Sequence, residues 1–135
     1  MTRLLKGGCY CGAIRYEADG TPLNETSCHC SICRRTSGAP FVAWFSVERD
    51  RFRFVSGQPS YFKSTAQAIR SFCPRCGTQL TFQHEDSAQE IDVTTCSLDD
   101  PHAAPPRDHT HTSSKLEWIK LADRLPEYRK RRADG

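Results

Sequence analysis

Seven of the eight cysteines in this chain fall into three tight groups. They form a CxC pair, a CxCxxC triplet and a CxxC pair, made by Cys9 and Cys11, by Cys28, Cys30 and Cys33, and by Cys73 and Cys76. Zinc is a chemical cause for such grouping, because it takes four ligands in a tetrahedron and closely spaced thiolates supply its corners. Gly12 and Gly77 follow the two pairs directly, where the chain must turn sharply and positive φ is tolerated.

Seven thiolates do not close two four-cysteine sites. A division into four and three leaves one zinc saturated and the other with a free position, which is the difference between structural and catalytic zinc. The triplet places three sulfurs within six residues, so we assign Cys28, Cys30 and Cys33 to the open, catalytic site. The CxC and CxxC pairs then form the closed, structural site. The sequence therefore predicts two zinc ions per chain.

Other interpretations of the cysteines stay open. Eight cysteines allow 105 disulfide connectivities, although CxC partners are too close in sequence to bridge comfortably. A single structural zinc with three spare thiols is a second possibility. Cys96 stands alone after an expected strand; we interpret it as a small buried hydrophobe, against a fourth metal ligand or a reactive thiol.

Length and composition indicate one domain in a reducing compartment. The 135 residues suit a single core, expected over residues 1–128. The N-terminus lacks the apolar stretch of a signal peptide, and no apolar run is long enough to cross a bilayer, so we expect a cytoplasmic protein with no membrane partner. Cysteine pairs in such a compartment more often bind metal than each other.

The net charge of +3 is concentrated at the C-terminus. Residues 129–132 read Arg-Lys-Arg-Arg and carry four positive charges, which leaves the rest of the chain near neutral. We interpret residues 129–135 as a solvated basic tail rather than a nucleic-acid contact.

The elements that must position the cysteines are mainly strands. Segments that mix β-branched and aromatic residues between turn formers predict strands at residues 13–18, 41–47, 51–55, 68–72, 78–83 and 91–95. Strict alternation over residues 51–54 indicates a half-buried strand, and the apolar run 39–45 indicates one covered on both faces. Helical patterns are confined to residues 31–36 and 126–132. We predict a mainly antiparallel β domain, with a proline-rich loop over residues 99–108.

At this point the motifs resemble a known family, the glutathione-dependent formaldehyde-activating enzymes, whose domain is shared with centromere protein V. The motifs that carry the resemblance are GCYCGAIRY at 8–16, CHCSICRR at 28–35, SGAPF at 37–41, RSFCPRCGT at 70–78 and KLEW at 115–118. The resemblance implies a zinc-stapled β-tent of antiparallel sheets with short helices. It also implies the same division of the cysteines between a structural and a catalytic zinc. The activity that the resemblance implies is a carbon–sulfur lyase reaction in reverse, which joins formaldehyde to glutathione as S-(hydroxymethyl)glutathione.

An open zinc would bind a substrate thiol in ionised form, ready to add to formaldehyde or a related small carbonyl. Three or four thiolates on one zinc leave net negative charge, and Arg34 and Arg35, directly after Cys33, are the candidates to offset it. Arg70 and Lys63 are further cations that a glutathione carboxylate could meet.

The remaining side chains receive structural interpretations. His29, between two ligands, is expected to point away from the metal, while His102, His109 and His111 are expected to be solvated, yet they are the nearest neutral-pH proton carriers. Trp44 is expected to pack in the core.

Two functions of other classes remain as alternatives. One is a non-catalytic zinc scaffold whose second site is closed by Cys96 or a histidine. The other is a thiol redox enzyme resembling the zinc-bearing methionine sulfoxide reductases, with Cys96 or Cys33 as nucleophile.

Overall fold

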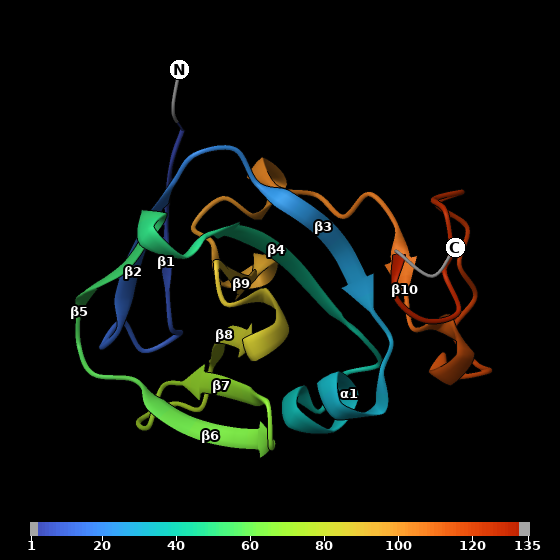
Figure 1. Ribbon diagram of the computed structural model, residues 1–135, viewed down its shortest axis with the longest axis horizontal. Helices are drawn as coiled ribbons and strands as arrows, with labels where there is room; N and C mark the ends of the chain where they lie inside the picture. The colour runs from blue at the N-terminus through green and yellow to red at the C-terminus, as the bar shows by residue number, and fades with distance from the viewer. Residues whose placement is uncertain (1–2, 133–135) are drawn as a thin grey trace.

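The computed structural model describes residues 3–132, which form two β-sheets with short helices between the strands (Figure 1). The smaller sheet has the order β1-β2-β5, with β1 (Leu4–Gly8), β2 (Arg15–Asp19) and β5 (Phe52–Ser56). The larger has the order β10-β3-β4-β9-β8-β7-β6. Its strands are β3 (Leu23–Cys28), β4 (Val42–Glu48), β6 (Ser60–Thr65), β7 (Ala68–Phe72), β8 (Gln79–His84), β9 (Glu90–Thr94) and β10 (His109–Thr110).

Neighbouring strands pair antiparallel except β10, which runs parallel to β3. The helix α1 (Ser31–Ser37) follows β3. Single-turn 3₁₀ helices complete the chain: η1 (Arg49–Arg51), η2 (Glu85–Ser87), η3 (Thr95–Ser97), η4 (Pro101–Ala103) and η5 (Thr112–Ser114). The prediction of a mainly antiparallel β domain with short helices is confirmed.

Every strand expected from the sequence is present within a residue or two, and the helix expected over 31–36 is α1. Strands β1, β3, β6 and β10 were not predicted. The helix expected over 126–132 is wrong, because the backbone there lies beside β10. The N–H of His109 donates to the carbonyl of Pro126 at 2.8 Å, and that of Tyr128 to the carbonyl of His109 at 2.8 Å. Pairing with a distant strand outweighs a weak helical pattern.

The core lies between the two sheets and uses one face of the larger sheet. Tyr16 and Phe52 from the smaller sheet pack with Phe45, Val47 and Val93 from the larger one, and all five are buried. Side chains alternate along a strand, so Trp44 and Ser46 of β4 point to the opposite face. That second face of the larger sheet, turned away from the core, is the one that carries the cavity described below.

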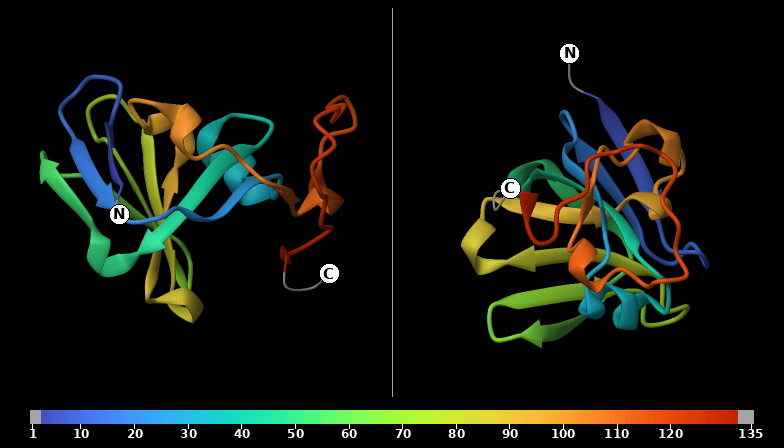
Figure 2. Two further views of the ribbon diagram at one scale, coloured as in Figure 1. Left: turned by 90° about the horizontal axis from the view of Figure 1, so that it is seen from above. Right: turned by 90° about the vertical axis from the view of Figure 1, so that its right-hand side faces the viewer.

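Helix α1 and the C-terminal segment lie at one end of the larger sheet. In Figure 1 and the left view of Figure 2 the C-terminal segment (residues 109–132), at the red end of the colour scale, lies on the opposite side of the molecule from β1 and β2. The Cys30 side chain caps α1 by accepting from the N–H of Cys33, and Gly38 ends it with a φ of 65°. Among the described residues no helix has the length and hydropathy needed to cross a membrane.

Residues 129–132, expected as a solvated tail, make hydrogen bonds to the β domain. The N–H of His111 donates to the carbonyl of Lys130 at 3.0 Å, and the guanidinium of Arg132 pairs with the buried carboxylate of Asp108. Residues 133–135 of that expected tail lie outside the described residues. The division at residue 128 stays a prediction.

Candidate metal centres

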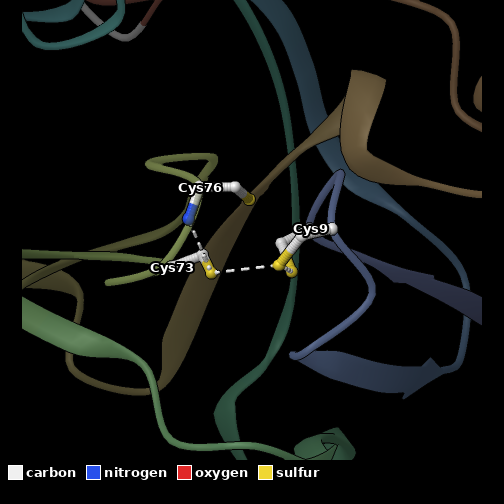
Figure 3. A group of neighbouring side chains, drawn as sticks. Cys9, Cys73 and Cys76 are labelled. Atoms are coloured by element: carbon white, nitrogen blue, oxygen red, sulfur yellow. Dashed lines mark hydrogen bonds between the residues drawn. The ribbon is translucent and has the colours of Figure 1, made fainter.

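The first cysteine group gathers four sulfurs from two turns that are far apart in the sequence. Cys9 and Cys11 come from the turn between β1 and β2, and Cys73 and Cys76 from the turn between β7 and β8. Figure 3 shows Cys9 facing Cys73 and Cys76 across the gap between these turns. All four sulfurs lie within 4.8 Å of one another.

The two turns have the same construction. Gly12 and Gly77 both have a φ of 82°, a left-handed conformation that suits glycine and that was expected from the sequence. The N–H of Gly12 donates to the carbonyl of Cys9 at 3.1 Å, and that of Gly77 to the carbonyl of Cys73 at 2.8 Å. Each turn therefore presents its two sulfurs on the same side.

The sulfur spacing of the four-cysteine group fits a tetrahedral metal. Zinc–sulfur bonds of about 2.3 Å place the ligands of a tetrahedron about 3.8 Å apart. Here Cys9 Sγ lies 3.6 Å from Cys11 Sγ, and Cys11 Sγ lies 3.8 Å from Cys73 Sγ. Backbone N–H groups donate to the sulfurs, from Ile14 to Cys9 at 3.2 Å and from Cys76 to Cys73 at 3.4 Å. The group fits a closed four-thiolate site.

The second group has three sulfurs, those of Cys28, Cys30 and Cys33, again within 4.8 Å of one another. Cys28 ends β3, and the other two lie at the start of α1, so one short turn presents all three. Cys33 Sγ lies 3.5 Å from Cys28 Sγ, and the N–H of Cys33 donates to Cys30 Sγ at 3.2 Å. No fourth cysteine, histidine or acidic ligand joins this group among residues 3–132.

Three sulfurs this close do not all ionise without a cation. Hydrogen bonds from Cys28 and Cys33 hold the pKa of the Cys30 thiol far below its ordinary value. Hydrogen bonds with Cys30 and Cys33, together with burial, raise the pKa of the Cys28 thiol. A soft divalent cation such as zinc relieves this conflict, because thiolates are its preferred ligands. The donor set and its spacing therefore fit a metal with one position left for another ligand.

The three-cysteine group lies at one end of a cavity of about 570 Å³ on the second face of the larger sheet. The larger sheet forms the cavity floor through residues of β3, β4, β6, β7, β8 and β9, and α1 and the C-terminal segment also line it. Trp44 and Phe82 line the floor, with ring centroids 6.1 Å apart. Trp44 was expected only to pack in the core; it is buried, and it also forms cavity wall.

A buried arginine reaches the three-cysteine group from the cavity floor. Arg70 of β7 is only 4% exposed, and its Nη2 donates to Cys33 Sγ at 3.5 Å. Its Nη1 donates to Thr36 Oγ1 at 3.2 Å, and its guanidinium lies over the rings of Phe82 and Trp44. No carboxylate lies within ion-pair distance of Arg70 in the part of the chain described. The anion beside this cation is thus the cysteine group itself.

His29, between Cys28 and Cys30, does not join the three-cysteine group and contacts His109 instead, in line with the expectation that it points away from a metal held there. It is fully buried, and burial lowers its pKa to about 4. Its Nε2 lies 2.9 Å from His109 Nδ1, and His109 Nε2 lies 2.8 Å from the Asp123 carboxylate. A neutral His29 that donates to His109, which donates in turn to Asp123, satisfies both contacts. This chain ties the cysteine turn to the C-terminal segment.

The histidines expected to be solvated differ from one another. His109 is 2% exposed, so that expectation is wrong for it, whereas His102 is exposed. His111 lines the cavity. The structure buries His109 because β10 pairs with β3, a contact between segments about eighty residues apart that no local pattern indicates.

The arginines after Cys33 do not reach the cavity. Arg34 donates to the carbonyl of Ser114 at 3.3 Å, and Arg35 is exposed; neither lines the cavity, and nor does Lys63. The sequence suggested Arg70 only as a contact for a substrate carboxylate. The sequence feature that could have indicated a role near the cysteines is the position of Arg70 three residues before Cys73, at the start of the motif RSFCPRCGT.

Cys96 is exposed, so the expectation of a buried hydrophobe is wrong. It lies in η3, and its sulfur belongs to neither cysteine group. A fourth-ligand role for Cys96 gains no support from this placement.

Comparison with known proteins places these observations in a family. Residues 4–114 match the family described as glutathione-dependent formaldehyde-activating enzyme. A protein of Halomonas elongata, named provisionally as such an enzyme, is 28% identical over 131 residues, covering 90% of this chain and 83% of the relative. An uncharacterized lyase of Schizosaccharomyces pombe is 32% identical over 79 residues, covering 58% of this chain and 57% of the relative.

The fold also has a counterpart among solved structures. The crystal structure of a Rhodobacter sphaeroides protein aligns with a TM-score of 0.60 at 21% identity, covering 91% of this chain and 98% of that one. At this identity the likeness concerns the fold alone. The family match spans both cysteine turns of the closed group, the triplet and the strands that carry them. The chain belongs to the family of glutathione-dependent formaldehyde-activating enzymes.

Proposed function

We propose that this protein is a zinc-dependent, carbon–sulfur lyase-type enzyme that joins a small thiol such as glutathione to formaldehyde or a related small carbonyl. Its family and the names of its relatives support a lyase-type activity at the coarser level. The observation that carries the finer proposal is the contrast in ligand number. Four sulfurs close the first group, whereas three sulfurs at the end of a cavity form the second.

In this proposal Cys9, Cys11, Cys73 and Cys76 hold a structural zinc, and Cys28, Cys30 and Cys33 hold a catalytic one. When bound, the second zinc supplies a Lewis-acid position that keeps a substrate thiol ionised. The substrate sulfur then forms a bond to the carbonyl carbon, the π electrons move to the carbonyl oxygen, and that oxygen takes up the proton that the thiol released. The chain's own residues hold the charges and the proton during these changes.

Arg70 offsets the negative charge. Three thiolates on a divalent cation carry a formal charge of −1, and a substrate thiolate makes it −2. A guanidinium 3.5 Å from Cys33 Sγ, without a carboxylate partner in the described chain, is placed to stabilise that charge. Trp44 and Phe82, which flank the guanidinium, keep water from it and so strengthen the interaction.

His111 is the histidine placed to move the proton. It lines the same cavity as the three cysteines. His84 also lines that cavity but lies two residues past Phe82, level with Glu90 and away from the cysteines, and His109 is engaged with His29 and Asp123. An imidazole accepts and releases protons near neutral pH, which suits transfer between the thiol and the new hydroxyl.

The alternative functions have no observation that favours them. A redox enzyme using Cys96 would need that thiol near a binding site, yet Cys96 does not line the cavity. Cys33, the other candidate nucleophile, does line it, but as one of the three clustered sulfurs assigned here to a metal. A scaffold would need a fourth ligand at the triplet, and none joins it among residues 3–132. We place the enzyme in the cytoplasm, where glutathione keeps such thiols reduced.

The proposal is tested by metal content and by exchange kinetics. We expect two zinc ions per purified chain, and an accelerated exchange between glutathione, formaldehyde and their hemithioacetal, followed by NMR. The Cys30→Ser variant should retain one zinc and lose the acceleration. A wild-type protein with two zinc ions and an exchange rate equal to the buffer rate would contradict the named activity.

A further inference from the structure

The end of the cavity remote from the cysteine triplet carries a carboxyl group with no role so far. Strand register places Arg70, Phe82, Asp92 and Ser46 in one row across β7, β8, β9 and β4, because each pairs directly with the next. Directly paired residues point to the same face of a sheet. Asp92 therefore lies on the cavity floor, together with Ser46 and Glu90 at its far end.

A hydrogen-bond chain orients this carboxyl group. Ser46 Oγ donates to Asp92 Oδ1 at 2.6 Å. The amide of Asn24 donates to Ser46 Oγ at 3.2 Å and to Glu90 Oε1 at 3.3 Å. Because Ser46 has its only proton committed to Asp92, it fixes the direction of the carboxylate.

Asn24 itself is held in an uncommon backbone conformation. Its φ is 54°, in the left-handed region, and it lies where the pairing of β3 with β4 shifts register between Leu23 and Thr26. Such irregularities re-aim a side chain, and asparagine tolerates them better than most residues. Here the irregularity turns the Asn24 amide toward Ser46 and Glu90 on the cavity floor.

The Asp92 carboxylate forms no ion pair among the described residues. Its Oδ1 accepts the hydrogen bond from Ser46. Arg70 in the same row is engaged with Cys33 and Thr36. Burial raises the pKa of Asp92 to about 6 although Ser46 and Arg70 lower it, so burial disfavours the ionised form more than these two neighbours stabilise it.

Distance excludes a direct part in the chemistry at the triplet. Cys28 pairs with Val42, and Asp92 pairs with Ser46, four residues further along β4. Four residues span about 13 Å of strand, far beyond the reach of a proton transfer. A group in the same cavity, but on the order of 10 Å from the thiol position, is suited to recognise another part of the substrate.

We propose that Asp92, oriented by Ser46 and Asn24 and assisted by Glu90, binds the ammonium group of an amine-bearing thiol whose sulfur lies at the cysteine triplet. This inference rests on the proposed function, which places the sulfur. In a γ-glutamyl thiol such as glutathione the sulfur and the amino nitrogen are eight bonds apart, roughly 10 Å when extended. In cysteine only three bonds separate them, about 4 Å at most, so cysteine cannot reach both ends. The subsite thus selects γ-glutamyl thiols by length and charge.

The test compares two ligands on two variants by calorimetric titration of the zinc-loaded protein. The ligands are glutathione and its desamino analogue glutaryl-cysteinyl-glycine, which lacks only the ammonium group. The variants are Asp92→Asn, which keeps the shape, and Asp50→Asn, which removes one exposed carboxylate elsewhere. Wild type should bind glutathione at least roughly tenfold more tightly than the analogue, and Asp92→Asn should abolish that ratio by weakening glutathione alone. Asp50→Asn should preserve it.

The two ligands separate failure of this inference from failure of the proposed function. Equal affinities for both ligands in wild type would overturn the ammonium subsite and leave thiol binding at the triplet intact. An unchanged ratio in Asp92→Asn would do the same. Binding of neither ligand by protein that holds two zinc ions would overturn the proposed function itself. Far-ultraviolet circular dichroism and zinc content verify that each variant is folded and loaded.

Discussion

The two cysteine groups use the same ligand chemistry in opposite settings. The four-cysteine group joins two turns far apart in the sequence, and half of its cysteines are exposed. The three-cysteine group comes from one short turn, and it lies at the end of a cavity of about 570 Å³. In the proposed function, the site that bridges distant segments holds a structural zinc and stabilises the fold, whereas the site built from one turn keeps a coordination position for a ligand. Ligand spacing along the chain thus separates the two roles.

The surroundings of the two groups differ as much as their ligand numbers. The closed group is stabilised by backbone N–H donors and by the Thr78 hydroxyl, 3.2 Å from Cys76 Sγ. The open group has a buried guanidinium as neighbour, flanked by aromatic rings. At a site whose four ligands are all present, hydrogen bonds from neutral donors are enough to stabilise the thiolates. At a site that gains and loses an anionic ligand, a fixed cation also stabilises the charge that the ligand adds.

The sharpest way to break this comparison is to remove one ligand from each group. Cys73→Ser should leave the chain unfolded or insoluble, because structural zinc contributes about 10 kcal/mol or more, comparable to the whole stability of a domain. Cys30→Ser should stay folded, lose one zinc and lose activity. Zinc content and thermal unfolding by circular dichroism measure both. A folded Cys73→Ser protein, or an unfolded Cys30→Ser protein, would reverse the assigned roles.

The next largest effect concerns the cation beside the open group. Arg70→Met should weaken binding of the second zinc roughly tenfold to hundredfold, as loss of a neighbouring stabilising group does, and lower the exchange rate at least as much. Arg70→Lys should recover part of both, since it keeps the charge without the planar fork. Chelator competition measures the zinc affinity. The control is Arg53→Met, an exposed arginine of β5 paired with Glu17, and a control as impaired as Arg70→Met would contradict a specific role.

A smaller effect concerns the cavity face of the larger sheet, where the titration of Asp92 should make stability depend on pH. Burial raises the pKa of Asp92 to about 6, above its ordinary value of 3.8, despite Arg70 nearby and with Glu90 adding to the rise. Between these values the folded state holds a proton that the unfolded state has lost, so stability falls as pH rises toward 6. Asp92→Asn removes this loss. The difference between the free energy of unfolding of Asp92→Asn and that of wild type should therefore be about 1 kcal/mol larger at pH 7.5 than at pH 5, in favour of the variant.

Urea unfolding of zinc-loaded, substrate-free protein at the two pH values measures this difference. Ser46 from β4, Asn24 from β3 and His84 from β8 also line the cavity near Asp92. Glu90→Gln serves as the comparison, because it removes another negative charge from the same part of the cavity. If wild type and Asp92→Asn respond equally to pH, Asp92 is not a strained ionised group.

The smallest expected effect is that of Cys96→Ala. The Cys96 side chain is exposed and lies outside both groups, so the variant should keep two zinc ions, its stability within about 0.5 kcal/mol and its exchange rate. Zinc analysis and kinetics suffice to check this. Loss of one zinc in Cys96→Ala would show that this thiol closes the open site, and would favour a scaffold.

The sequence by itself determined the grouping of the cysteines and most of the strands. Local spacing sets which sulfurs share a turn, as in Cys28, Cys30 and Cys33, and alternation over residues 51–54 sets which face of β5 is buried. These are properties of a few consecutive residues, and the structure retains them. The pairing of the two outer cysteine groups also followed, because only one division of seven thiolates left a closed and an open set.

Only the tertiary structure decided what surrounds the open group. Arg70 reaches Cys33 because β7 lies in the floor below α1, and Asp92 shares its row through the register of β8 and β9. His109 is buried, and residues 126–132 do not form the expected α-helix, because both pair with distant segments. Contacts across a sheet depend on strand order and register, which local patterns in one sequence do not encode. The two cysteine groups were therefore predictable from the chain, and the cavity beside the three-cysteine group was not.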